Sequence, residues 1–97
     1  MIPTSEELLR VLTEMGSTAK EVATTLRDVG IKGMRVDGHN CPIANYLKTK
    51  FPGETIHVSY AGIDIGDHGN YVEVFPPQPV LEFMTGFDAG RHSDLRF

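Results

Sequence analysis

The stretch CPIANYLKTKFPGETIHVSY, residues 41–60, changes its hydrophobic period half-way along, and this change decides the fold. As far as Phe51 the apolar residues keep the spacing of one helix face, and Pro52 followed by Gly53 ends such a helix. From residue 55 onward apolar and polar residues alternate, which is typical of a half-buried strand. A helix followed directly by a strand predicts an α+β protein.

Two further helices are predicted ahead of this stretch, over residues 5–15 and 19–29. Each begins with a Thr-x-x-Glu capping box, one starting at Thr4 and the other at Thr18, in which two side chains satisfy free backbone N–H groups. The loop around Gly16 is short, so the two helices fold back on each other. A connector with one short β-capable piece then leads to the third helix.

A second strand is predicted at YVEVF, residues 71–75, and forms an antiparallel hairpin with the first. Ile63 and Ile65 extend the first strand beyond a bulge at Gly62. A short helix follows PPQP. The predicted fold is therefore winged-helix-like: three N-terminal helices, an antiparallel β-hairpin and a short C-terminal helix. A single globular domain spans residues 1–87, and residues 88–97 form a C-terminal tail, either mobile or docking.

The chain has 97 residues and a net charge of −4, which fits one small domain. No apolar run is long enough to cross a bilayer, and the amino terminus carries acids where a secretory signal carries bases, so we expect no membrane contact. One cysteine cannot form an internal disulfide, which favours a cytoplasmic location. The charges are segregated: residues 18–52 hold six basic and three acidic residues, whereas residues 53–97 hold two and seven.

The order of elements resembles winged helix-turn-helix domains, and STAKEVATTL is similar to the second helix of that family. The resemblance implies that the third helix enters the major groove of DNA and that residues 62–70 form the wing. Its reading face comprises Asn45, Lys48, Thr49 and Lys50. The wing departs from the family because it contains aspartates and neither lysine nor arginine, and such a wing repels phosphate.

A second resemblance concerns GIKG, followed after a few residues by CPIANYL. These motifs are similar to small uncharacterised proteins of actinobacteria and their phages. The resemblance implies such an origin and no particular activity.

Two groups of residues have the side chains of a catalytic site or a metal site. Cys41 lies at the start of the third helix, where the helix dipole favours a thiolate, and His39 is close enough in sequence to act as a base. The simpler interpretation is a buried cap residue and a loop histidine. Asp64, Asp67 and His68 lie at the hairpin tip, but their spacing fits no known metal loop and is ordinary for a turn. We therefore predict no metal site and no cofactor.

The segment VLEFMTGF places Phe83, Met84 and Phe87 close together, either as core or as a contact surface for a partner or a homodimer. The favoured function is a small non-enzymatic regulatory or interaction module. It binds a protein partner through Asn45, Lys48, Thr49 and Lys50, the hairpin, and the C-terminal apolar residues. One alternative is a nucleic-acid-binding winged-helix protein. The other is a Cys-dependent enzyme.

Overall fold

A computed structural model describes residues 2–67 and 69–97, and it has the α+β architecture that the sequence predicts. Three helices come first: α1 (Ser5–Thr13), α2 (Ala19–Asp28) and α3 (Pro42–Lys50). Three strands follow: β1 (Ile56–Val58), β2 (Ile63–Gly66) and β3 (Tyr71–Val74). The chain ends with helix α4 (Gln78–Asp88) and a 3₁₀ turn, η1 (Ser93–Leu95).

The helix starts have the predicted caps. The Thr4 hydroxyl accepts a hydrogen bond from the Glu7 N–H, and the Glu7 carboxylate accepts one from the Thr4 N–H. At α2 only half of the predicted box forms: the Thr18 hydroxyl accepts a hydrogen bond from the Glu21 N–H, but the Glu21 carboxylate accepts one from the Ser17 N–H instead of the Thr18 N–H. At α3 the Cys41 thiol takes the capping position, with Pro42 at the first helical turn. These local signals explain why three helices precede the sheet.

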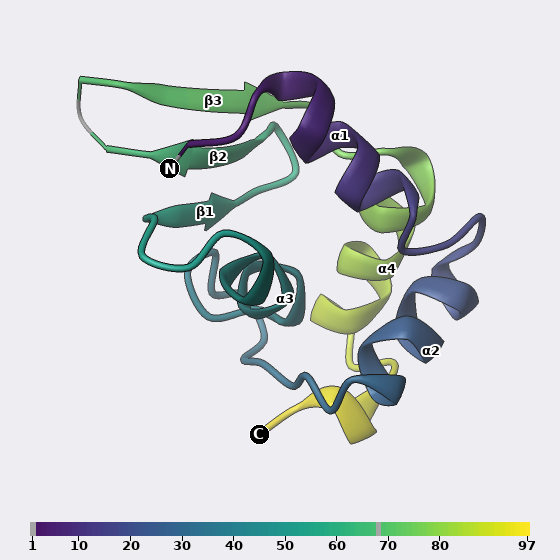
Figure 1. Ribbon diagram of the computed structural model, residues 1–97. Coiled ribbons are helices and arrows are strands. Elements are labelled where there is room, and N and C mark those ends of the chain that lie inside the picture. Colours follow the sequence, from purple (N-terminus) through teal and green to yellow (C-terminus); the bar gives the residue numbers. More distant parts are fainter. Residues whose placement is uncertain (1, 68) are drawn as a thin grey trace.

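The sheet has one strand more than the predicted hairpin. Gly62 is not a bulge: Ser59 and Gly62 exchange backbone hydrogen bonds of 2.9 and 3.3 Å, which close a tight turn after β1. Ile63 therefore begins a separate strand, antiparallel to β1, and β3 pairs with β2 on the other side. The strand order is β1-β2-β3 (Figure 1).

The helices cover one face of this sheet and leave the other face to solvent. The inward-facing residues Ile56, Val58, Ile63 and Ile65 are buried in the core. Helix α3 contacts β1, α1 contacts β3, and α4 packs against α2. The opposite face carries exposed polar side chains such as His57 and Glu73.

The segment 88–97, predicted as a tail after a domain boundary at residue 87, packs against the rest of the described chain. Leu95 is buried in the core. The Gly33 N–H donates to the Leu95 carbonyl at 2.8 Å, and Asp94 forms an ion pair with Arg27 of α2. In Figure 1 this segment lies beside the connector between α2 and α3, which we define as residues 30–40.

Candidate functional site

The polar face of α3 is largely engaged with the chain's own connector. Asn45 is half-buried, and its side-chain amide donates to the carbonyl oxygens of Lys32 and Asn40 at 2.8 and 3.0 Å. The Lys48 ammonium donates to the His39 carbonyl at 2.7 Å and to the Asn45 side-chain oxygen at 3.2 Å. These two residues therefore hold the connector against α3, although Lys48 remains exposed.

The other two residues predicted on this face bind only their own helix. The Thr49 hydroxyl donates to the Tyr46 carbonyl at 2.6 Å, and the Lys50 ammonium lies 5.3 Å from the centre of the Tyr46 ring. Both side chains are exposed. The structure thus brings all four predicted α3 residues to one region, but it gives two of them a structural role.

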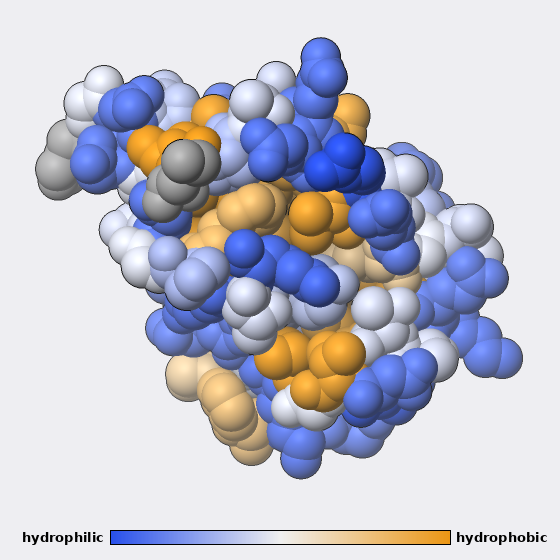
Figure 2. Space-filling view, in the orientation of Figure 1, coloured by the Kyte–Doolittle hydropathy of each residue, from blue (hydrophilic) through white to orange (hydrophobic). Residues whose placement is uncertain are grey.

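The predicted C-terminal binding residues belong to the core. Phe83 and Phe87 are buried with their rings stacked 5.8 Å apart, and Met84 is 7% exposed. Phe83, Met84 and Phe87 therefore do not form an exposed contact surface. The three side chains reach the exterior only as part of the wall of a pocket. On the face seen in Figure 2, hydrophobic residues surface in separate patches divided by hydrophilic ones.

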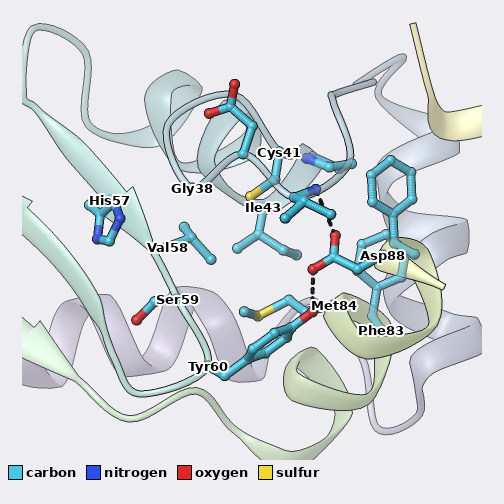
Figure 3. A pocket seen from close by; sticks show the side chains of 14 residues that line it. Gly38, Cys41, Ile43, His57, Val58, Ser59, Tyr60, Phe83, Met84 and Asp88 are labelled. Carbon is cyan, nitrogen blue, oxygen red and sulfur yellow. Dashed lines mark hydrogen bonds between the residues drawn. The ribbon is translucent and has the colours of Figure 1, made fainter.

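That pocket has a volume of about 200 Å³ and is mostly apolar, with walls from the connector, the start of α3, β1 and α4 (Figure 3). Asp88 joins two of its walls, because its carboxylate accepts hydrogen bonds from the Tyr60 hydroxyl and from the Val36 N–H. Burial and the nearby carboxylate raise the pKa of Tyr60 to about 12. Asp88 therefore fastens the connector to the turn after β1.

Cys41 lines this pocket as an unactivated thiol. Burial raises its pKa, and the negative charge of Asp88 acts in the same direction, which outweighs the hydrogen bonds from the start of α3. His39 does not bond to the thiol: its Nδ1 lies 3.0 Å from the Ile56 carbonyl, and its ring packs 4.9 Å from that of His57. The geometry therefore favours a structural cap over a Cys-His catalytic pair.

The hairpin tip has ordinary turn chemistry in the part of it that the structure describes. The Asp67 carboxylate accepts hydrogen bonds from the backbone N–H groups of Gly69 and Asn70. Asp64 lies within β2, away from this turn, and His68 lies outside the described residues. Among residues 2–67 and 69–97 no group of three His, Cys, Asp or Glu is placed to hold a metal ion.

One edge of the sheet is closed by the connector. The Val58 N–H of β1 donates to the Gly38 carbonyl at 2.8 Å, and the Ile56 carbonyl meets the His39 ring. Gly38 fits here because a Cβ would come within 2.6 Å of the Val58 carbonyl oxygen. The Val58 N–H and the Ile56 carbonyl, which point outward from β1, are thus bound by the chain's own connector.

Comparison with protein families, with curated proteins and with solved structures found no significant match to this chain. Within the described residues, moreover, every helix is too short or too polar to cross a bilayer.

The other edge of the sheet is open. Backbone groups of successive residues point to opposite sides of a strand. The backbone N–H and C=O groups of Ile56 and Val58 point away from the sheet. Those of His57, which lies between them, therefore point toward β2, where His57 pairs with Asp64. The backbone groups of Asp64 therefore point toward β1, and those of the next residue, Ile65, point toward β3.

The register pairs Ile65 with Val72, so Val72 turns its backbone groups inward and its neighbours Tyr71 and Glu73 turn theirs outward. The outward N–H and C=O groups of these two residues have no hydrogen-bond partner among the residues that the structure describes. We call these groups, with the side chains of Tyr71, Glu73 and Phe75, the open edge. Figure 1 shows β3 as the outermost strand, with α1 beside its carboxyl end.

The open edge carries two large exposed aromatic side chains. Tyr71 is 59% exposed and Phe75 is 64% exposed, on either side of Glu73 on the solvent face of the sheet. The sequence predicts YVEVF as a strand of the hairpin, and Tyr71 and Phe75 are not among the predicted binding residues. The sequence nevertheless contains the signal, because an alternation that partly buries Val72 and Val74 turns the residues before and after each of them toward solvent.

Proposed function

We propose that this chain is a small, non-enzymatic protein-binding module that accepts an extended segment of a partner along β3. The observation that carries the proposal is the contrast between the two sheet edges. The connector binds the Val58 N–H and places its His39 ring on the Ile56 carbonyl, whereas the outward backbone groups of Tyr71 and Glu73 lack a partner among the described residues. An unpaired edge is a template for a further strand.

Strand addition uses both parts of the open edge. The backbone N–H and C=O groups supply hydrogen bonds that do not depend on the partner's sequence. The rings of Tyr71 and Phe75 supply apolar area, and aromatic side chains are enriched among the residues that dominate binding energy. The short β3 limits the number of backbone bonds, so the aromatic contacts contribute much of the affinity.

A protein partner suits this surface better than a nucleic acid. The sheet face beside the open edge carries Asp64 and Glu73, and negative charge opposes phosphate. On α3 the Lys48 ammonium is already bound to the connector. The same proposal places the protein in the cytoplasm, where the free thiol of Cys41 stays reduced.

The test begins with selection of binders from a displayed library of random peptides and continues with Glu73→Pro. Proline removes an outward N–H of the open edge, and it leaves the pairing with β2 intact because Glu73 turns away from β2. Glu73→Gln is the matched control, since it keeps the N–H. We expect selected peptides to bind the native chain and Glu73→Gln, and to lose most affinity for Glu73→Pro.

Tyr71→Ala combined with Phe75→Ala provides a second variant if Glu73→Pro does not fold, and it should also weaken binding. Failure to select any peptide, or binding that neither variant reduces, overturns the proposal. Salt-sensitive binding to duplex DNA that is lost in Lys48→Ala plus Lys50→Ala also overturns it.

A further inference from the structure

Two carboxylates lie side by side next to the open edge. Asp64 of β2 and Glu73 of β3 are direct cross-strand partners, and the nearby Asp64 carboxylate raises the pKa of Glu73. The Asp64 Oδ1 atom is buried and has no hydrogen-bond partner among the described residues. Neither β2 nor β3 contains a lysine or arginine. This face of the hairpin therefore holds negative charge that no basic residue of its own strands offsets.

The geometry of strand addition determines which residue of the partner lies next to the negative charge of Glu73. Glu73 turns its backbone groups outward, so an added antiparallel strand places one residue directly opposite it, with its side chain on the same face. Cβ atoms of such a pair lie about 5 Å apart. The partner residues two positions before and after face Tyr71 and Phe75 by the same alternation.

We infer that the partner segment is an antiparallel strand with a lysine or arginine opposite Glu73 and with apolar residues two positions to either side. This inference rests on the proposed function and adds the chemistry of the partner. Opposite charges on facing residues stabilise a strand pair, and an aromatic or β-branched residue packs well against an aromatic one. Arginine or lysine opposite Glu73 also supplies a hydrogen-bond donor near Asp64.

A second copy of the chain fits this edge poorly. Symmetric antiparallel pairing of two β3 strands centred on Glu73 sets this glutamate against its counterpart, with an Asp64 on the neighbouring strand of each copy. Like charges directly opposite each other destabilise a strand pair. A basic segment from another protein is therefore the better complement.

The probes are three matched peptides in which threonines separate a phenylalanine, a central residue and a valine. The central residue is lysine, glutamine or glutamate. Affinity is measured by NMR titration at low salt, following the amide signals of Tyr71 and Glu73. We expect the lysine peptide to bind the native chain about two- to fivefold more tightly than the glutamine peptide, and the glutamate peptide to bind most weakly. Added salt should reduce the differences in affinity among the three peptides, because it screens the charges.

The charge-reversed variant Glu73→Lys is decisive, and it should reverse the order so that the glutamate peptide binds best. The same order for both proteins, or equal affinities of the three peptides for the native chain, overturns the inference. If the affinities are equal but Glu73→Pro still abolishes binding, only the charge inference fails. If no peptide binds, or Glu73→Pro binds as well as the native chain, the proposed function fails with it.

Discussion

Asp64 and Glu73 face each other directly across β2 and β3, and the nearby Asp64 carboxylate raises the pKa of Glu73. A raised pKa in the folded state means that the pair is most favourable when Glu73 is protonated. The stability that the pair contributes to the folded state is fully present below the pKa of a glutamate in the unfolded chain. It is lost as the pH rises through the pKa of Glu73 in the folded protein. At neutral pH the two carboxylates therefore repel each other.

Glu73→Gln should relieve this repulsion. We expect the variant to have a higher urea midpoint than the native protein at pH 7, and the difference should shrink on acidification below the normal range for glutamate. Urea unfolding followed by circular dichroism at both pH values measures it. A difference that is absent at pH 7, or that grows on acidification, contradicts the assigned pair.

Gly38 lets the connector approach β1 closely, so Gly38→Ala should push the two apart. The added Cβ would lie 2.6 Å from the Val58 carbonyl oxygen and 2.8 Å from the His57 ring. We expect a loss of about 1–3 kcal/mol in unfolding free energy, together with faster hydrogen exchange at the Val58 N–H. Gly69→Ala is the matched control, because a Cβ there meets nothing within 4 Å. Equal effects of the two substitutions would show that the close approach is not present.

Asn45 is assigned to connector binding, so Asn45→Ala should reduce stability more than it reduces peptide binding. Its amide satisfies the carbonyls of Lys32 and Asn40, and losing such bonds costs about 1–3 kcal/mol. Lys50→Ala is the control on the same helix and should change stability by less than about 0.5 kcal/mol. Thermal unfolding and the peptide titration separate the two effects. An Asn45→Ala protein that is as stable as the native chain but no longer binds the peptide would show that Asn45 is a binding residue.

Cys41 should react slowly with a small thiol reagent in the folded protein and rapidly after unfolding. Burial leaves the thiol 9% exposed and raises its pKa, so little thiolate is present at neutral pH. A time course of labelling, followed by mass spectrometry with and without denaturant, provides the measurement. Labelling of the native protein at the rate of an exposed peptide thiol would instead support the Cys-dependent enzyme.

The sequence predicted the helices well because their signals are local. The capping residues and the helical spacing lie within each segment. The capping position of Cys41 follows from Pro42, the next residue, because proline is favoured at the first position of a helix. The separate strand β2 was missed because Gly62 suits a bulge as well as a turn, and only the pairing of Ser59 with Gly62 distinguishes them. Local patterns do not encode such pairing.

The roles of the α3 residues depended on long-range packing. Helical spacing correctly placed Lys48 on the exposed side of α3, but the path of the connector determines that it and Asn45 bind backbone carbonyls. The open edge likewise depends on strand order, because β3 is free only while the connector lies along β1 rather than along β3. Alternation within YVEVF predicts the exposed aromatic residues but not the unpaired backbone.

Residue-resolved hydrogen exchange of the free protein tests the central claim most directly. The account predicts slow exchange at the N–H groups of Val58, Val72 and Val74, which are paired, and fast exchange at those of Tyr71 and Glu73, which point outward. Protection of Tyr71 and Glu73 equal to that of Val72 would show that this edge is already covered, and would contradict the proposed binding of a partner strand.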